Sequence, residues 1–236
     1  AMTNGDARVA LNALELAASA TPPDPSGARH VGLDTIEDAL QQRSILYDKA
    51  GDQHYDTISA FIKSVRGSDP DAAIYWLVRM IEAGEDPMFI ARRLVILAAE
   101  DIGMAEPQGL SVAMATQQAV HFIGMPEGAI PLAEATVYLA TAPKSNSAYA
   151  ALNQAKEDVR RTRNEPVPMH LRNAVTPLME EQGYGKGYKY SHDYQGHFAA
   201  MENLPASLRD RRYYQPSDQG YEKTVSQRLR EWWAGQ

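Results

Sequence analysis

Two Asp-Pro pairs, Asp69-Pro70 and Asp86-Pro87, each stand directly before a long apolar segment. An aspartate accepts hydrogen bonds from the free amides of a helix start, and proline is tolerated in the first helical turn because its missing amide would have no partner there. The pairs therefore predict two helices, one ending near Gly84 and the next near Gly103. Both segments are apolar on more than one face, which is typical of central helices in a bundle.

Most of the remaining chain also repeats its apolar residues at three- and four-residue steps, which predicts further helices. Asp34 or Thr35 is the candidate cap of the helix predicted at residues 34–43. The ranges with this pattern are 4–20, 34–43, 56–65, 106–124, 130–142, 145–163, 176–182 and 217–233. Almost no segment alternates with period two, so we predict an all-α fold, a helical bundle. After about residue 164 the chain is rich in proline, glycine and tyrosine, which predicts an irregular tail.

Charge and composition exclude several classes of function. The net charge is −7 and the isoelectric point is about 5.4, so any nucleic-acid binding requires a local basic patch. There is no cysteine, which excludes disulfides, thiolate zinc sites and cysteine nucleophiles in this chain. No apolar run is long enough to suggest a membrane span, and we expect a soluble, cytoplasmic protein.

The chain shows no nucleotide-binding or metal-binding motif. A phosphate-binding loop needs spaced glycines followed by Lys and Ser or Thr, whereas the Gly185-Lys186 pair is followed by Gly187. His192 and His197 match no compact metal site, and we interpret them as polar loop residues. We therefore assign no catalytic residue and no metal ligand.

Two charged clusters have a structural and a functional interpretation. Glu100-Asp101 ends an apolar helix, where carboxylates oppose the helix dipole, so we expect a neighbouring cation, Arg92 or Arg93. Arg161 lies with two other arginines near the end of the 145–163 helix, where cations complement the dipole. A phosphate contact by Arg161 is the alternative.

The stretch YGKGYKYSHDYQGHF, residues 184–198, mixes aromatic rings with lysines. Tyr188 beside Lys186 and Lys189 could stack on bases while the ammonium groups meet phosphates. The same mixture occurs at protein interfaces. Because the chain is acidic, we favour packing or an interface here and keep nucleic-acid binding open.

Several long segments resemble the replication-associated recombination protein A family (RarA, also called MgsA), whose eukaryotic relative is the Werner-helicase-interacting ATPase. The resemblance covers essentially the whole chain, in which motifs such as GDAR, AEDIG, APKSNS and YGKGYKYSHDY follow one another in the family's order. It implies the C-terminal half of an AAA+ ATPase related to clamp loaders, without the nucleotide-binding core, and the opening Ala1-Met2 fits a tag remnant. Residues 3–45 would end the helical lid. Residues 46–236 would form a helical oligomerisation domain similar to the clamp-loader collar, with an extended tail.

The resemblance also implies a role for Arg8 in GDAR as the sensor-2 arginine, which reaches the nucleotide's γ-phosphate in the intact protein. Arginine suits that role because its charge is fixed and its donors are planar. Val9 stands where we expect another basic residue, which removes one nearby charge. ATP and Mg²⁺ would serve the full-length protein, and we expect no cofactor in this fragment.

The expected partners follow from the same resemblance. They are further copies of the chain in a homotetramer, DNA, and single-stranded-DNA-binding protein, with no membrane and a nucleoid-associated location. We therefore expect an oligomerisation and regulatory module of a DNA-dependent ATPase of replication-fork maintenance and recombination, without ATP hydrolysis of its own. The alternative is a DNA-binding module that uses the tail, with Arg161, Lys186, Tyr188 and Lys189 as candidates. A third interpretation, a hydrolase that acts without the missing core, has no support, because the sequence contains no set of residues typical of a catalytic nucleophile.

Overall fold

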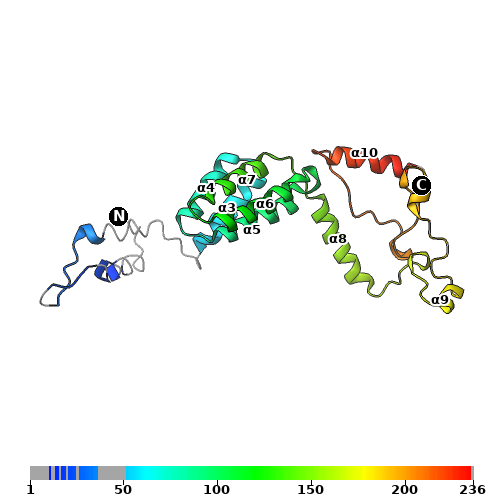
Figure 1. Cartoon of the computed structure of the whole chain (residues 1–236), viewed down its shortest axis with the longest axis horizontal. Coiled ribbons are helices and arrows are strands. Elements are labelled where there is room, and N and C mark those ends of the chain that lie inside the picture. The colour runs from blue at the N-terminus through cyan, green and yellow to red at the C-terminus, as the bar shows by residue number, and fades with distance from the viewer. Residues whose placement is uncertain are drawn as a thin grey trace. The chain divides into compact units, whose positions relative to one another are not determined.

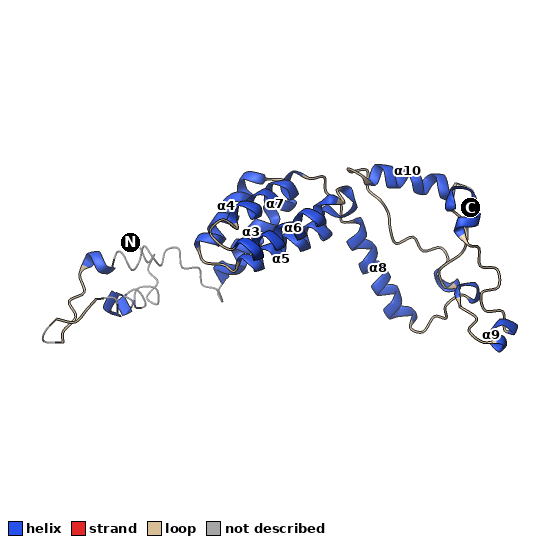
Figure 2. Ribbon diagram, in the orientation of Figure 1, coloured by secondary structure: helices blue, strands red, loops and turns tan. Residues whose placement is uncertain are grey.

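The computed structural model describes residues 11, 14–15, 17–19, 21–24, 27–36 and 52–234. Every regular element in these ranges is helical, and none is a strand (Figure 2). The predicted all-α fold is therefore confirmed. The chain divides into two compact units. We call them the bundle unit, from residues 1–95 and 112–141, and the tail unit, from residues 96–111 and 142–236.

Within residues 52–141, helices α3 to α7 contribute to the bundle unit (Figure 1). They are α3 (Asp52–Arg66), α4 (Pro70–Glu82), α5 (Pro87–Leu97), α6 (Gln108–Ile123) and α7 (Ala129–Thr141). Helices α3, α4 and α7 contact one another. Each of the five overlaps a range that the sequence pattern predicts as helix. The expected boundary near residue 45 lies outside the described residues.

Both Asp-Pro pairs begin helices as predicted. The Asp69 carboxylate accepts from the Ala72 amide at 2.9 Å, and the Asp86 carboxylate accepts from the Met88 amide at 2.9 Å. The prediction of an Asp34 or Thr35 cap is wrong. Residues 33–36 are already helical, because the turn begins at Gly32, whose carbonyl accepts from the Ile36 amide.

The core of the bundle unit consists of fully buried apolar side chains. They include Phe61, Val65, Leu77, Met80, Ile90, Leu94, Leu132 and Leu139. Burying such a side chain stabilises the fold by about 1.5–3 kcal/mol. The expectation that α4 is a central helix of the bundle is only partly right, because Tyr75 is 59% exposed and Val78 is 48% exposed.

The second Asp-Pro helix ends near Gly103 as predicted, but its last turn changes type. Residues Ala98–Ile102 form a π-helix, which the Gly103 amide closes by donating to the Ala98 carbonyl. Gly103 has a φ of +51°, and a Cβ there would lie 2.6 Å from the Ser145 carbonyl oxygen. A glycine is therefore required where the chain leaves the helix.

The expected cation beside Asp101 is found on a residue that we did not predict. The buried Asp101 carboxylate attracts the charge of Lys144. Burial lowers the pKa of the Lys144 ammonium group, and the negative charge of Asp101 opposes that shift. Of the two predicted partners, Arg92 lies 3.5 Å from Asp86 and over the ring of Phe89, and Arg93 lies over the same ring. A cation on the neighbouring loop thus offsets the carboxylate at the helix end.

The tail unit is built on one long helix and an irregular chain. Its helices are α8 (Ser147–Thr162), α9 (Pro177–Glu181) and α10 (Glu222–Trp233), with short 3₁₀ turns at Met169–Leu171, Ser191–Asp193, Gln195–His197 and Ala206–Leu208. The predicted irregular tail is confirmed between residues 164 and 221. Helix α10 begins five residues later than predicted, because residues 217–221 fold into turns around Gly220, which has a φ of +48°. None of the described helices combines the length and apolarity that crossing a bilayer requires.

Candidate functional site

The tyrosine- and lysine-rich stretch is exposed on the tail unit. Tyr188 and Tyr190 are 52% and 55% exposed, and Lys186 and Lys189 are also exposed. The Lys189 amide donates to the Met201 sulfur at 3.2 Å and its ammonium group to the Ala200 carbonyl at 3.3 Å. We call Lys186, Tyr188, Lys189 and Tyr190 the tyrosine–lysine surface. Within one chain its rings do not fill a core.

The two histidines of this stretch lie close together. The ring centroids of His192 and His197 are 5.0 Å apart, and Tyr190 lies 5.1 Å from His192. Within residues 27–36 and 52–234, and at the few earlier described positions, no group of three possible metal-binding side chains occurs.

The other predicted positions fall in different places. Arg161 lies on α8, where its guanidinium group is 2.7 Å from the Asp158 carboxylate while its side chain stays 63% exposed. The sensor-2 candidate Arg8 lies outside the described residues. The structure therefore brings Lys186, Tyr188 and Lys189 together on one segment and places Arg161 on another element.

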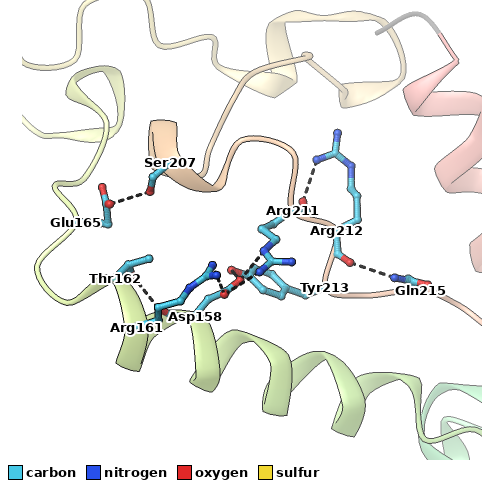
Figure 3. Close-up of polar contacts among 9 residues, drawn as sticks. All are labelled: Asp158, Arg161, Thr162, Glu165, Ser207, Arg211, Arg212, Tyr213 and Gln215. Atoms are coloured by element: carbon cyan, nitrogen blue, oxygen red, sulfur yellow. Dashed lines mark hydrogen bonds and ion pairs between the residues drawn. The ribbon is translucent and has the colours of Figure 1, made fainter.

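Asp158 forms a buried centre of polar contacts that the sequence did not reveal. Figure 3 shows Arg161, Arg211 and Tyr213 converging on its carboxylate. The Arg211 side chain lies 2.8 Å away, and the Tyr213 hydroxyl donates at 3.1 Å. Burial would raise the pKa of Asp158, but the hydrogen bonds from Tyr213 and Arg211 and the two arginine charges outweigh it and lower the pKa. We call this group the Asp158 clasp.

Glu222, the first residue of α10, forms a second such centre. Its side chain is fully buried, and it accepts from the hydroxyls of Ser145 at 2.6 Å and of Ser147. The Tyr214 hydroxyl and the Ser217 amide also donate to it, both at 2.8 Å. We call this group the Glu222 clasp. It ties the start of α10 to the loop before α8.

The protonation states of the Glu222 clasp follow from these contacts. Burial works against ionisation of Glu222, but hydrogen bonds from Ser145, Ser147 and Ser217 outweigh it and lower the pKa to about 2. Burial and the adjoining carboxylate raise the pKa of Tyr214 to about 12. Glu222 is therefore a weak base that holds no proton at neutral pH, and Tyr214 keeps its proton. The site is suited to fixing the chain and not to proton transfer.

Both clasps were missed from the sequence. The APKSNS motif, residues 142–147, supported only the family resemblance, although Ser145, whose hydroxyl accepts from the Ser147 amide at 3.2 Å where α8 begins, carries a recognisable capping signal. Their partner Glu222 lies 75 residues beyond Ser147. No spacing rule connects residues so far apart. A buried glutamate at a helix start reads as an ordinary first-turn acid.

Comparison with known proteins assigns both parts of the chain. Residues 67–233 match the family model described as "MgsA AAA+ ATPase C terminal", and residues 1–66 match "AAA C-terminal domain". An uncharacterized AAA domain-containing protein of Mycobacterium tuberculosis is 50% identical over 95% of this chain and 49% of its own length.

Two further relatives carry functional names. Replication-associated recombination protein A of Escherichia coli K12 is 45% identical over 97% of this chain and 51% of its own length. The ATPase WRNIP1 of Dictyostelium discoideum is 39% identical over 91% of this chain and 26% of its own length. The chain spans about half the length of the bacterial relatives named here. With its all-helical fold and these matches, the chain belongs to the MgsA AAA+ ATPase C-terminal family.

Proposed function

We propose that this chain is the oligomerisation and regulatory module of a DNA-dependent AAA+ ATPase that acts in replication-fork maintenance and recombination. The names of the relatives support the recombination role. In this proposal ATP and Mg²⁺ bind to the full-length protein, and this chain does not hydrolyse ATP alone. DNA and single-stranded-DNA-binding protein are proposed partners of the whole protein, at the nucleoid.

The observation that carries this proposal is a group of exposed apolar side chains, close together in sequence, from the end of α6 to the start of α7. Phe122 is 90% exposed, Ile130 is 70% exposed, Ile123 is 50% exposed and Met125 is 40% exposed. Soluble proteins rarely leave such large apolar side chains grouped on the surface unless another molecule covers them. We call Phe122, Ile123, Met125 and Ile130 the apolar cluster.

A second copy of this chain is the proposed occupant of the apolar cluster. Interfaces between copies are more apolar than transient contacts, and an interface with two-fold symmetry uses the same patch on both subunits. The family resemblance, which implies a homotetramer, supports the same choice. Covering Phe122 and Ile130 in this way would remove the largest exposed apolar side chains of α6 and α7.

Light scattering of a dilution series at low and moderate salt tests the proposal. We expect a mass near four times the 26.0 kDa of one chain, and a smaller mass for Phe122→Ser combined with Ile130→Ser. Val78→Ser is the matched control, since Val78 is an exposed apolar residue of the same unit outside the cluster. A monomer at every concentration would rule the proposal out. Dissociation by Val78→Ser alone would move the interface to α4.

DNA binding by the tail is a second candidate function, favoured by the exposure of the tyrosine–lysine surface. Aromatic rings that stay accessible next to ammonium groups can stack on bases while the lysines meet phosphates. Exchange of Lys186 and Lys189 for alanine should then weaken binding to single strands and reduce its salt dependence. If the affinity of this variant for single strands is unchanged, the tyrosine–lysine surface does not bind DNA and is better explained as a protein interface.

A further inference from the structure

A cavity of about 370 Å³ lies within the tail unit, between residues 198–204, residues 209–214 and the end of α10. Ligand pockets in proteins typically measure about 300–1,000 Å³. The side chains that give the wall its chemistry are Phe198, Arg209, Arg212, Tyr213, Tyr214 and Trp233. The wall therefore combines flat aromatic rings with positive charge.

The two clasps hold part of this wall in place. Tyr213 is fixed by its hydrogen bond to the buried Asp158, and Tyr214 by its hydrogen bond to the buried Glu222. Both hydroxyls are occupied by these carboxylates. A wall whose side chains are already ordered loses less entropy when a ligand binds.

The cations of the cavity are not all offset. The charge of Arg211 is offset by the Asp158 clasp, and Glu202 is the one acid among the lining residues. Arg209 and Arg212 form no ion pair with any residue in the described part of the chain. The Arg212 guanidinium group donates to two backbone carbonyls and lies 5.4 Å from the ring centroid of Trp233. These two arginines give the cavity a positive charge beside aromatic faces.

We propose that this cavity binds one unpaired nucleotide, with the base against the aromatic rings and the phosphate at Arg209 and Arg212. Bases stack on aromatic side chains and on guanidinium planes, and arginine donors match phosphate geometry. Because Arg212 already lies over one face of the Trp233 ring, the base would stack on the outer side of this guanidinium plane or on the other face of the indole. This nucleotide site goes beyond the oligomerisation proposal and does not require it. It shares only the class of ligand, a nucleic acid, with the proposed DNA binding by the tyrosine–lysine surface.

The tyrosine–lysine surface is attached beside the cavity. Lys189 contacts Ala200 and Met201, and Met201 itself lines the cavity. Aromatic rings paired with cations thus occur twice on connected segments, which matches the repeat of base and phosphate along a strand. An acidic peptide would need only one such cavity, so the repeat favours a nucleotide.

The nucleotide can come from a free mononucleotide or from a single strand, and titration with each separates the two. The probes are thymidine monophosphate and a labelled single-stranded oligothymidylate, with its duplex and an acidic peptide that ends in phenylalanine as comparisons. Arg209→Ala combined with Arg212→Ala should weaken binding by about tenfold or more. In a Trp76→Phe background, a bound base should quench the tryptophan fluorescence. Adding Trp233→Phe to that background should abolish the quenching.

The matched control is Lys156→Ala combined with Lys223→Ala, which removes two exposed charges from the same unit outside the cavity. Selective loss in the arginine pair supports the proposal, for a strand or a free nucleotide according to the probe bound. Equal loss in both pairs would overturn it, as would binding of the peptide alone or of neither nucleotide probe. The mass of each sample, measured by light scattering, separates this result from a failure of oligomerisation.

Discussion

The bundle unit and the tail unit are each stabilised internally by a different kind of interaction. Phe61 and Leu132 in the bundle unit are fully buried among apolar neighbours, where the stabilisation is non-directional and roughly proportional to area. The tail unit instead depends on the Asp158 and Glu222 clasps, where each bond needs one particular partner at one geometry. A core residue of the bundle unit should therefore lose stability in proportion to the apolar volume that a substitution removes, whereas a clasp should fail when a single donor or acceptor is removed.

The largest expected effect is on the bundle unit. Phe61→Ala should destabilise it by about 3–5 kcal/mol, because the substitution leaves a cavity in a fully buried place. Urea unfolding followed by far-ultraviolet circular dichroism measures this. Tyr55 lies on the same helix but is 68% exposed. Tyr55→Ala should therefore lower the free energy of unfolding by only about 0.5 kcal/mol or less. Equal losses for the two variants would contradict the assignment of the core.

The next effect concerns the Glu222 clasp. Glu222→Ala should destabilise the tail unit by about 3 kcal/mol, because four donors lose their common acceptor. Faster hydrogen exchange at the Ser217 amide, which donates to Glu222, measures the loss. Glu231→Ala on the same helix is the control, since that carboxylate is exposed and, among the described residues, accepts only from Gln227. Unchanged exchange in Glu222→Ala would show that the clasp does not hold α10.

The same contrast explains what could be predicted from the sequence. The helices of the bundle unit follow from local signals, such as the Asp69 and Asp86 caps and the spacing of apolar residues. The π-helix before Gly103 was not predicted, because its i→i+5 bond depends on the loop packed against it. A local pattern specifies an element, but the contact that closes it comes from elsewhere in the chain.

The candidate site was predictable only where it is local. Lys186, Tyr188 and Lys189 are neighbours in sequence, so their common surface could be expected. The pair Asp158 and Tyr213 is separated by 55 residues, and its formation depends on the path of an irregular tail. Buried polar pairs also leave no periodic trace, because a single acid at one position reads as a solvated residue. Long-range polar contacts therefore had to be found in the structure.

The smallest of these effects is a pH dependence confined to the tail unit. The folded pKa of Glu222, about 2, lies below its ordinary value of 4.5, so this stabilisation is present above pH 4.5 and is lost as the pH falls toward 2. By about pH 3 the loss should reach roughly 2 kcal/mol, and the lowered pKa of Asp158 acts in the same direction. Near-ultraviolet circular dichroism of Trp232 and Trp233 in a Trp76→Phe variant follows the tail unit. Glu222→Gln should flatten the pH dependence, because it removes the titrating group while keeping its shape. If the bundle unit loses its helical signal before the tryptophan signal changes, the clasps are not the acid-sensitive part of the molecule.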